Sequence, residues 1–226
     1  MIGPQSSDET PVPAGQDPVA QEPTAVELLS AFSLAIDLAE GRQFNHARRT
    51  ACISLRLWDA LGLPEDRRRD VYCAGLLHDV GSINLAWPLA HLRPDSSSDR
   101  ELIRQHPHKS AEIARMLPFA GSAAEIIIGH HEFWDGSGYP FGLRQEQIPL
   151  EGRILCLADR LDILYGSEAA PDVQTLVEFA RRNAGTKFDP DLVDRFARMA
   201  DYPFDETHLS VLEAAEGLIP SQGSSV

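Results

Sequence analysis

The sequence predicts an all-α protein, and three observations support this fold class. Apolar residues recur along most of the chain at the spacing of amphipathic helices. Helix-ending and helix-starting signals separate these stretches, such as Gly62 followed by Pro64. We find no stretch with the alternating pattern of a half-buried strand. We therefore expect a single helical bundle of about seven to nine helices, without internal repeats.

The expected helices follow one another with short connections. The first two cover residues 24–41 and 44–61, and the third begins after Pro64 and ends at the doublet His78-Asp79. We expect Pro107 to divide the next segment into two short helices, because proline lacks the main-chain donor and its ring clashes with the preceding turn. Further helices are expected over residues 122–129, 151–165, 172–183 and 190–200.

The ends of the chain differ from its middle in composition. Residues 1–23 are rich in Pro, Ser and Gln and carry acidic residues but no basic ones, so we expect a disordered acidic leader. Residues 24–203 form the expected domain, and residues 204–226 form a weakly helical segment and a tail. With 43% apolar residues, a domain of this length can bury a substantial core.

Charge and composition argue against several classes of protein. The net charge of −14 argues against binding of duplex nucleic acid, which depends on clustered Lys and Arg. No apolar run approaches the roughly 18 residues of a membrane span, and no secretory signal is visible at the N-terminus. Cys52, Cys73 and Cys156 are widely separated in apolar contexts, which is typical of reduced thiols. We therefore expect a cytoplasmic protein.

One stretch, from His130 to Pro140, has the composition of a functional site. His130 and His131 end an apolar run and lead into a loop that contains Gly136 and Gly138. Glycine allows a ligand to approach the backbone closely, and Pro140 stiffens the exit of the loop. The stretch alone is also compatible with a helix end, a turn and two unrelated histidines.

Further candidate metal ligands lie far apart in the chain, on or near different expected helices. A helical bundle can bring such residues together. A carboxylate in an apolar segment, such as Asp159, needs a counter-ion. Taken singly, each of these residues is more often a structural hydrogen-bonding group. Together, five imidazoles and two carboxylates match what two metal ions with a shared carboxylate need: His46, His78, Asp79, His106, His130, His131 and Asp159.

These motifs resemble the HD-GYP family of the HD phosphohydrolase superfamily. The doublet His78-Asp79 matches the motif that names the superfamily, and residues 130–140 read HHEFWDGSGYP. The resemblance covers about residues 28–200. Further matching segments follow in the family's order: Gly142-Leu143, Ile148-Pro149, Arg153-Ile154-Leu155, Ala158-Asp159, Gly185 and Phe188-Asp189-Pro190.

The resemblance implies a metal-dependent phosphodiesterase that hydrolyses cyclic di-GMP or a related cyclic dinucleotide by attack of a metal-bridging hydroxide. It implies two divalent ions, Fe or Mn, held by the seven residues named above. Asp79 would bridge the ions and is the implied catalytic residue. The loop beside the substrate would contain Asp135, Gly136, Gly138 and Tyr139, with Glu132 supporting the ligands. Phe133 or Trp134 could stack on a guanine or belong to the core.

Three departures from the family pattern concern charge near the substrate. Ser82 stands where the family has a lysine, and residues 164–171 replace the family's Arg-Pro-Tyr-Arg segment. Arg42 replaces a glutamate that supports a third metal in some members, so we expect two metals. Ser82 and Arg42 are then candidate contacts for the substrate phosphate.

These departures leave a second interpretation open. The chain could be a catalytically weak or inactive regulatory module that keeps its metals and acts through a protein partner, such as a GGDEF-type protein. A phosphohydrolase for another nucleotide is a third interpretation, because fold alone does not determine the substrate.

Overall fold

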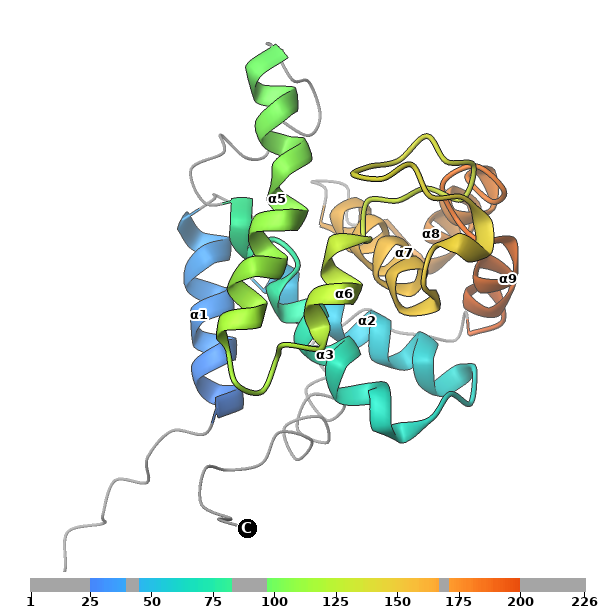
Figure 1. Cartoon of the computed structure of the whole chain (residues 1–226). Coiled ribbons are helices and arrows are strands. Elements are labelled where there is room, and N and C mark those ends of the chain that lie inside the picture. Colours follow the sequence, from blue (N-terminus) through green and yellow to red (C-terminus); the bar gives the residue numbers. More distant parts are fainter. Residues whose placement is uncertain (1–24, 40–44, 83–96, 167–170, 200–226) are drawn as a thin grey trace, which may run out of the picture.

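The computed structural model describes residues 25–39, 45–82, 97–166 and 171–199. Within these ranges the chain forms eight α-helices and three short 3₁₀ turns, and no strand (Figure 1). The predicted all-α class is therefore confirmed. The predicted leader (1–23) and C-terminal segment (204–226) lie outside the described residues.

The helices begin and end within a few residues of the expected positions, with one exception. The 3₁₀ turns are Glu65–Arg67, Val80–Ser82 and Gln145–Gln147. The helices are α1 (Ala25–Ala39), α2 (His46–Ala60), α3 (Arg68–Leu77), α5 (Ser97–Met116), α6 (Ala123–Ile128), α7 (Leu150–Tyr165), α8 (Val173–Arg182) and α9 (Pro190–Arg198).

The exception is α5, which continues through Pro107. The predicted division into two short helices is wrong. Proline at position 107 cannot donate a hydrogen bond to the carbonyl oxygen of Ile103. The His106 side chain takes over this role, because its Nδ1 lies 2.7 Å from that oxygen. A side chain thus replaces the main-chain donor that the helix loses.

Helices α2, α3, α6 and α7 supply most of the core. Their fully buried side chains include Leu55, Leu77, Ile127 and Leu157, and each such side chain contributes about 1.5–3 kcal/mol through burial. Helices α2 and α3 cross closely at Gly75, where a side chain would collide with the main chain of Ala51. This crossing keeps the start of α2 near the end of α3.

The turn after α3 packs tightly on α5. The main-chain N–H of Gly81 donates to Ser110 Oγ at 2.9 Å. A side chain at Gly81 would collide with the α5 backbone near Ser110 and His106. Glycine at this position therefore allows the His78-Asp79 doublet to lie directly beside α5.

The long loop between α6 and α7 runs along the side of the molecule where α8 and α9 lie (Figure 1). The main-chain N–H groups of Trp134 and Asp135 donate to the carbonyl oxygens of Lys187 and Thr186, at 3.1 and 2.9 Å. Arg153 of α7 pairs with Asp189, the residue before α9, at 2.6 Å. These contacts hold the start of the loop, and the helix that follows it, against the segment that leads into α9.

Candidate metal centre

The seven residues expected to bind metal converge in one place. They form two groups of four that share Asp79, and within each group the candidate ligand atoms lie within 4.8 Å of one another. Every one of the seven side chains is buried. We call His46, His78, Asp79 and Asp159 site 1, and Asp79, His106, His130 and His131 site 2.

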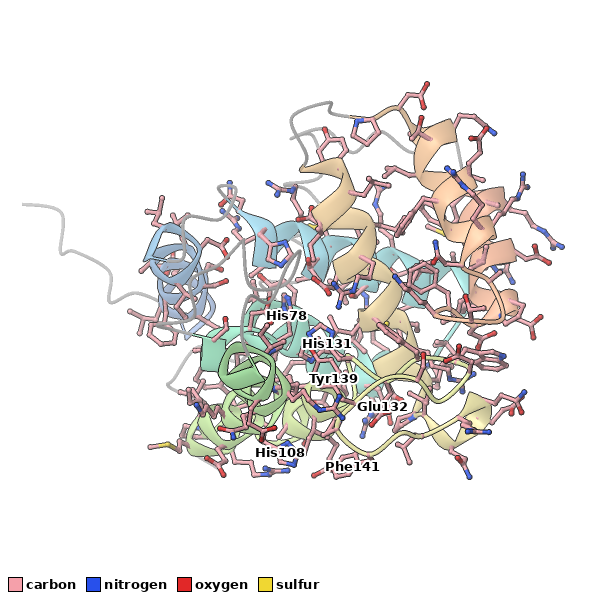
Figure 2. All side chains as sticks on the ribbon, turned by 90° about the horizontal axis from the view of Figure 1, so that it is seen from above. His78, His108, His131, Glu132, Tyr139 and Phe141 are labelled. Atoms are coloured by element: carbon pink, nitrogen blue, oxygen red, sulfur yellow. The ribbon has the colours of Figure 1, made fainter. Side chains whose placement is uncertain are left out.

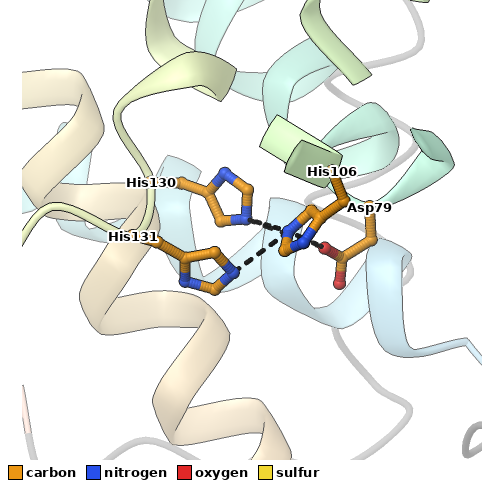
Figure 3. Close-up of side chains that lie close together, drawn as sticks. All are labelled: Asp79, His106, His130 and His131. Carbon is orange, nitrogen blue, oxygen red and sulfur yellow. Dashed lines mark hydrogen bonds and ion pairs between the residues drawn. The ribbon is translucent and has the colours of Figure 1, made fainter. Parts of the chain in front are cut away.

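Asp79 lies between the two groups and turns one carboxylate oxygen to each. Its Oδ2 is 3.0 Å from His78 Nε2 and 3.7 Å from His46 Nε2, in site 1. Its Oδ1 is 3.1 Å from His106 Nε2 and 3.7 Å from His130 Nε2, in site 2 (Figure 3). This arrangement suits a carboxylate that bridges two cations.

The fold delivers these side chains from different helices. His46 is the first residue of α2, His78 directly follows α3, and Asp159 lies within α7. His106 lies within α5 next to the proline described above. His130 and His131 follow the end of α6. Residues at the ends of some helices and in the interiors of others are thus brought to one place in the fold.

Three of the imidazoles are oriented by the same device. The Nδ1 atoms of His78, His106 and His130 lie 2.8, 2.7 and 2.6 Å from the carbonyl oxygen three residues earlier. Within α5, Pro107 removes the helical donor for this carbonyl, and near the end of α6 the Ile127 carbonyl also accepts from the main-chain N–H of His130 at 3.2 Å. A carbonyl can only accept, so Nδ1 carries the proton and Nε2 offers its lone pair to the centre.

His46 is oriented by a carboxylate to which the sequence analysis gave no role. Its Nδ1 lies 2.7 Å from Asp162 Oδ2. Arg49 donates to both oxygens of Asp162, at 2.6 and 3.1 Å. The available signal was the spacing of Asp159 and Asp162, because residues three apart share one face of a helix.

The polar atoms of the centre fit a divalent cation. Asp159 Oδ1 is buried without a hydrogen-bond partner among the described residues. The nearest imidazole nitrogens, His46 Nε2 and His78 Nε2, are 3.5 and 3.6 Å away. A bound cation would satisfy this oxygen, and carboxylate and imidazole groups are ligand types that divalent metal ions take.

The electrostatics of the two sites differ. In site 1, burial alone would lower the pKa of His78, but Asp79 and Asp159 outweigh it and raise this pKa to about 10. Burial would raise the pKa of Asp159, but Arg160 and His78 hold it below its usual range. In site 2, burial lowers the pKa of His130 to about 4. The two carboxylates of site 1 therefore favour positive charge more strongly than the single carboxylate of site 2 does.

Of the four loop residues predicted to lie beside the substrate, Tyr139 is the one whose described side-chain contacts include the ring of a candidate ligand. Its ring centroid is 4.8 Å from that of His131 (Figure 2). Asp135 is exposed, and its Oδ1 accepts a 2.8 Å hydrogen bond from the Ser137 N–H. Hydrogen bonds from the Ser137 side chain and from this N–H lower the pKa of Asp135. Gly138 is buried, and a side chain there would collide with the main chain of residues 131–133. Gly136 has φ of 81°, which favours glycine.

Glu132 anchors this loop. Its side chain is buried, and its two oxygens accept hydrogen bonds from the main-chain N–H groups of Phe141 and Leu143, at 2.6 and 2.9 Å. Because Glu132 directly follows His131, the candidate ligand and the loop anchor are neighbours in the chain.

Of the remaining candidates, the structure describes Ser82, Phe133 and Trp134. Ser82 is buried, and its hydroxyl donates to the Asp79 carbonyl oxygen at 2.5 Å. Its expected phosphate contact stays a prediction. Arg42 lies outside the described residues. Phe133 packs against the core, and the Arg153 guanidinium lies 5.6 Å from the centre of the Trp134 ring.

Comparison with known proteins identifies the class of this fold and site. Residues 31–192 match the model of the HD domain family, so the chain belongs to that family, as the motifs predicted. The crystal structure of the cyclic GMP-AMP specific phosphodiesterase V-cGAP3 of Vibrio cholerae shares the fold. Its TM-score is 0.69 and its identity 24%, over 88% of this chain and 55% of that one.

Curated relatives carry the names of cyclic dinucleotide phosphodiesterases. The cyclic di-GMP phosphodiesterase of Thermotoga maritima is 28% identical over 76% of this chain and 49% of its own length. The response regulator RpfG of Xanthomonas campestris pv. campestris, also a cyclic di-GMP phosphodiesterase, is 32% identical over 76% and 47%. The 3'3'-cGAMP-specific phosphodiesterase 2 of V. cholerae is 31% identical over 76% and 34%. The chain thus spans about half or less of each relative.

None of the helices in the described ranges has both the length and the apolar character that crossing a bilayer requires.

Proposed function

We propose that the chain is a metal-dependent phosphodiesterase that hydrolyses cyclic di-GMP or a related cyclic dinucleotide. The observation that carries this proposal is the position of Asp79, with one oxygen turned to each of two buried four-residue sites. Relatives named as cyclic di-GMP and cGAMP phosphodiesterases support the substrate class.

The proposed centre holds two divalent cations, Fe or Mn. His46, His78 and Asp159 would hold one, His106, His130 and His131 the other, and Asp79 both. When bound, two such cations lower the pKa of water and neutralise charge on a phosphate diester. The chain's own contribution is to fix the imidazoles through the hydrogen bonds behind them. Tyr139 forms the wall of site 2 toward the loop.

Location is the second part of this proposal. Cys52, Cys73 and Cys156 are free, buried thiols, as expected in a reducing compartment. We therefore place the protein in the cytoplasm.

A regulatory module that keeps its metals and acts on a protein partner, such as a GGDEF-type protein, is the alternative. The observation that favours it is the buried position of Ser82, whose hydroxyl is engaged by Asp79 and supplies no cation to a substrate.

The test combines metal analysis with a hydrolysis assay. The protein is purified anaerobically, loaded with Fe(II) or Mn(II), analysed for metal content, and incubated with cyclic di-GMP and 3'3'-cGAMP. We expect two metals per chain and hydrolysis of at least one substrate that Asp79→Ala abolishes. Two bound metals without turnover of either dinucleotide would favour the regulatory module.

A further inference from the structure

One imidazole of the centre is oriented differently from the other four. The Nδ1 atoms of His46, His78, His106 and His130 face a carbonyl or carboxylate oxygen. The Nδ1 atom of His131 instead lies 3.0 Å from Nη2 of Arg160. A guanidinium group has only donors. His131 Nδ1 must therefore accept, and the proton of the neutral ring resides on Nε2.

This proton lies on the atom that faces site 2. His131 Nε2 is 3.1 Å from Nε2 of His106, another member of site 2 (Figure 3). A ring nitrogen that carries a proton has no lone pair for a metal. A cation that uses His131 in site 2 must therefore displace this proton or separate His131 from Arg160. The Nδ1 atoms of the other four imidazoles face acceptor oxygens, so their hydrogen bonds already favour the proton on Nδ1 and require no change of tautomer.

Charge acts in the same direction. Site 1 contains two carboxylates, Asp79 and Asp159, whereas site 2 contains Asp79 alone. The partly buried guanidinium of Arg160 lies beside both sites: its Nη2 is 3.0 Å from His131 Nδ1 of site 2, and its Nε is 3.7 Å from Asp159 Oδ2 of site 1. Its charge opposes a cation at either site, and burial weakens the screening of this repulsion. Site 1 has a second carboxylate to offset that charge, and site 2 has none.

We propose that the two metal sites are unequal, that site 1 fills first, and that Arg160 is the positioning residue that weakens site 2. The inference rests on the proposed use of these residues as metal ligands but not on the identity of the substrate. Occupancy of site 2 would then follow the supply of free metal, while site 1 stays filled.

The experiment is a binding isotherm of Mn(II) on the metal-free full chain, followed by EPR, which distinguishes a single Mn(II) from an exchange-coupled pair. For the wild type we expect two steps, with the signal of a single ion at one equivalent and the coupled signal only at higher metal concentration. Two steps of equal affinity, or a coupled pair from the first equivalent onward, would overturn the proposal.

Arg160→Gln tests the residue directly, because an amide oxygen can accept a proton from His131 Nδ1 and the positive charge is gone. We expect the second step to tighten by about ten- to hundredfold, the usual scale for groups behind a metal ligand. Arg104→Gln is the matched control. Its guanidinium lies 5.3 Å from the centre of the Tyr139 ring, and we expect both steps to stay unchanged. An unchanged second step in Arg160→Gln contradicts the assignment.

Arg160→Lys keeps the charge and a donor, and we expect its isotherm to stay close to that of the wild type. A second step as tight in this variant as in Arg160→Gln would contradict the role given to the donor and the charge. Because the readout is metal binding, unequal sites in a protein without turnover would refute the phosphodiesterase and leave this inference standing.

Discussion

The candidate metal centre and the loop of residues 132–149 lie side by side but are held in different ways. Each side chain of the centre is buried, and a hydrogen bond behind each imidazole fixes its orientation. The loop is held mainly through its backbone, by Glu132 and by the carbonyls of Thr186 and Lys187. Side chains such as Asp135 and Phe141 remain exposed. A substitution in the centre should therefore remove metal, whereas one in the loop should alter substrate binding first.

Asp79→Asn should produce the largest effect. The amide keeps the shape but loses the charge and one of the two acceptor oxygens that face the sites. We expect activity to fall at least ~1000-fold with loss of metal, because several kcal/mol of charge stabilisation depends on the bridged pair. Metal analysis and the hydrolysis assay measure both. Asp70→Asn is the matched control, since Asp70 is a similarly buried carboxylate on α3 outside the centre. Retention of two metals in Asp79→Asn would contradict the bridging role.

Asp162→Asn should weaken the centre without touching a ligand. It removes the charge that orients His46 and pairs with Arg49. We expect Mn(II) to bind site 1 about ten- to hundredfold more weakly. Asp59→Asn disrupts a similar two-bond pair with Arg68 on the surface. It should leave metal binding unchanged and cost at most about 1 kcal/mol of stability. Equal isotherms for the two variants would show that Asp162 has no role in the centre.

Glu132→Gln should affect the loop and spare the metals. The amide nitrogen cannot accept, so one of the N–H groups of Phe141 and Leu143 loses its partner, at a cost of about 1–3 kcal/mol. We expect KM for the cyclic dinucleotide to rise about tenfold for each 1.4 kcal/mol lost, with unchanged metal content. Glu146→Gln, an exposed position in the same loop, should change neither. Loss of metal from Glu132→Gln would show that the centre and the loop are not separable.

Pro107→Ala should have the smallest effect, with opposite signs for stability and for metal binding. Alanine restores a main-chain donor for the Ile103 carbonyl and suits a helix far better than proline, so the melting temperature should rise. The new donor competes with His106 Nδ1, so Mn(II) should bind site 2 a few-fold more weakly. Pro118→Ala, beyond the end of α5, should leave metal binding unchanged. An unaltered isotherm for Pro107→Ala would show that the proline has no part in orienting His106.

The sequence was sufficient for the helical class and for selecting seven side chains that the structure brings together, because metal chemistry restricts the residue types that can serve as ligands. It failed at Pro107, because a rule about main-chain donors does not anticipate that a neighbouring histidine can replace the donor. It also missed the roles of Asp162 and Arg160. Their importance depends on which atom of a ring they face, and only coordinates show that.

The adjacency of His131 and Glu132 links the two regions through a single peptide bond. Removing the metals would free the His131 side chain and loosen the adjacent Glu132. The amides of Phe141 and Leu143 should therefore exchange with deuterium faster in the metal-free protein than in the metal-bound one. Exchange at these two amides of the loop would in this way report whether the metal centre is occupied.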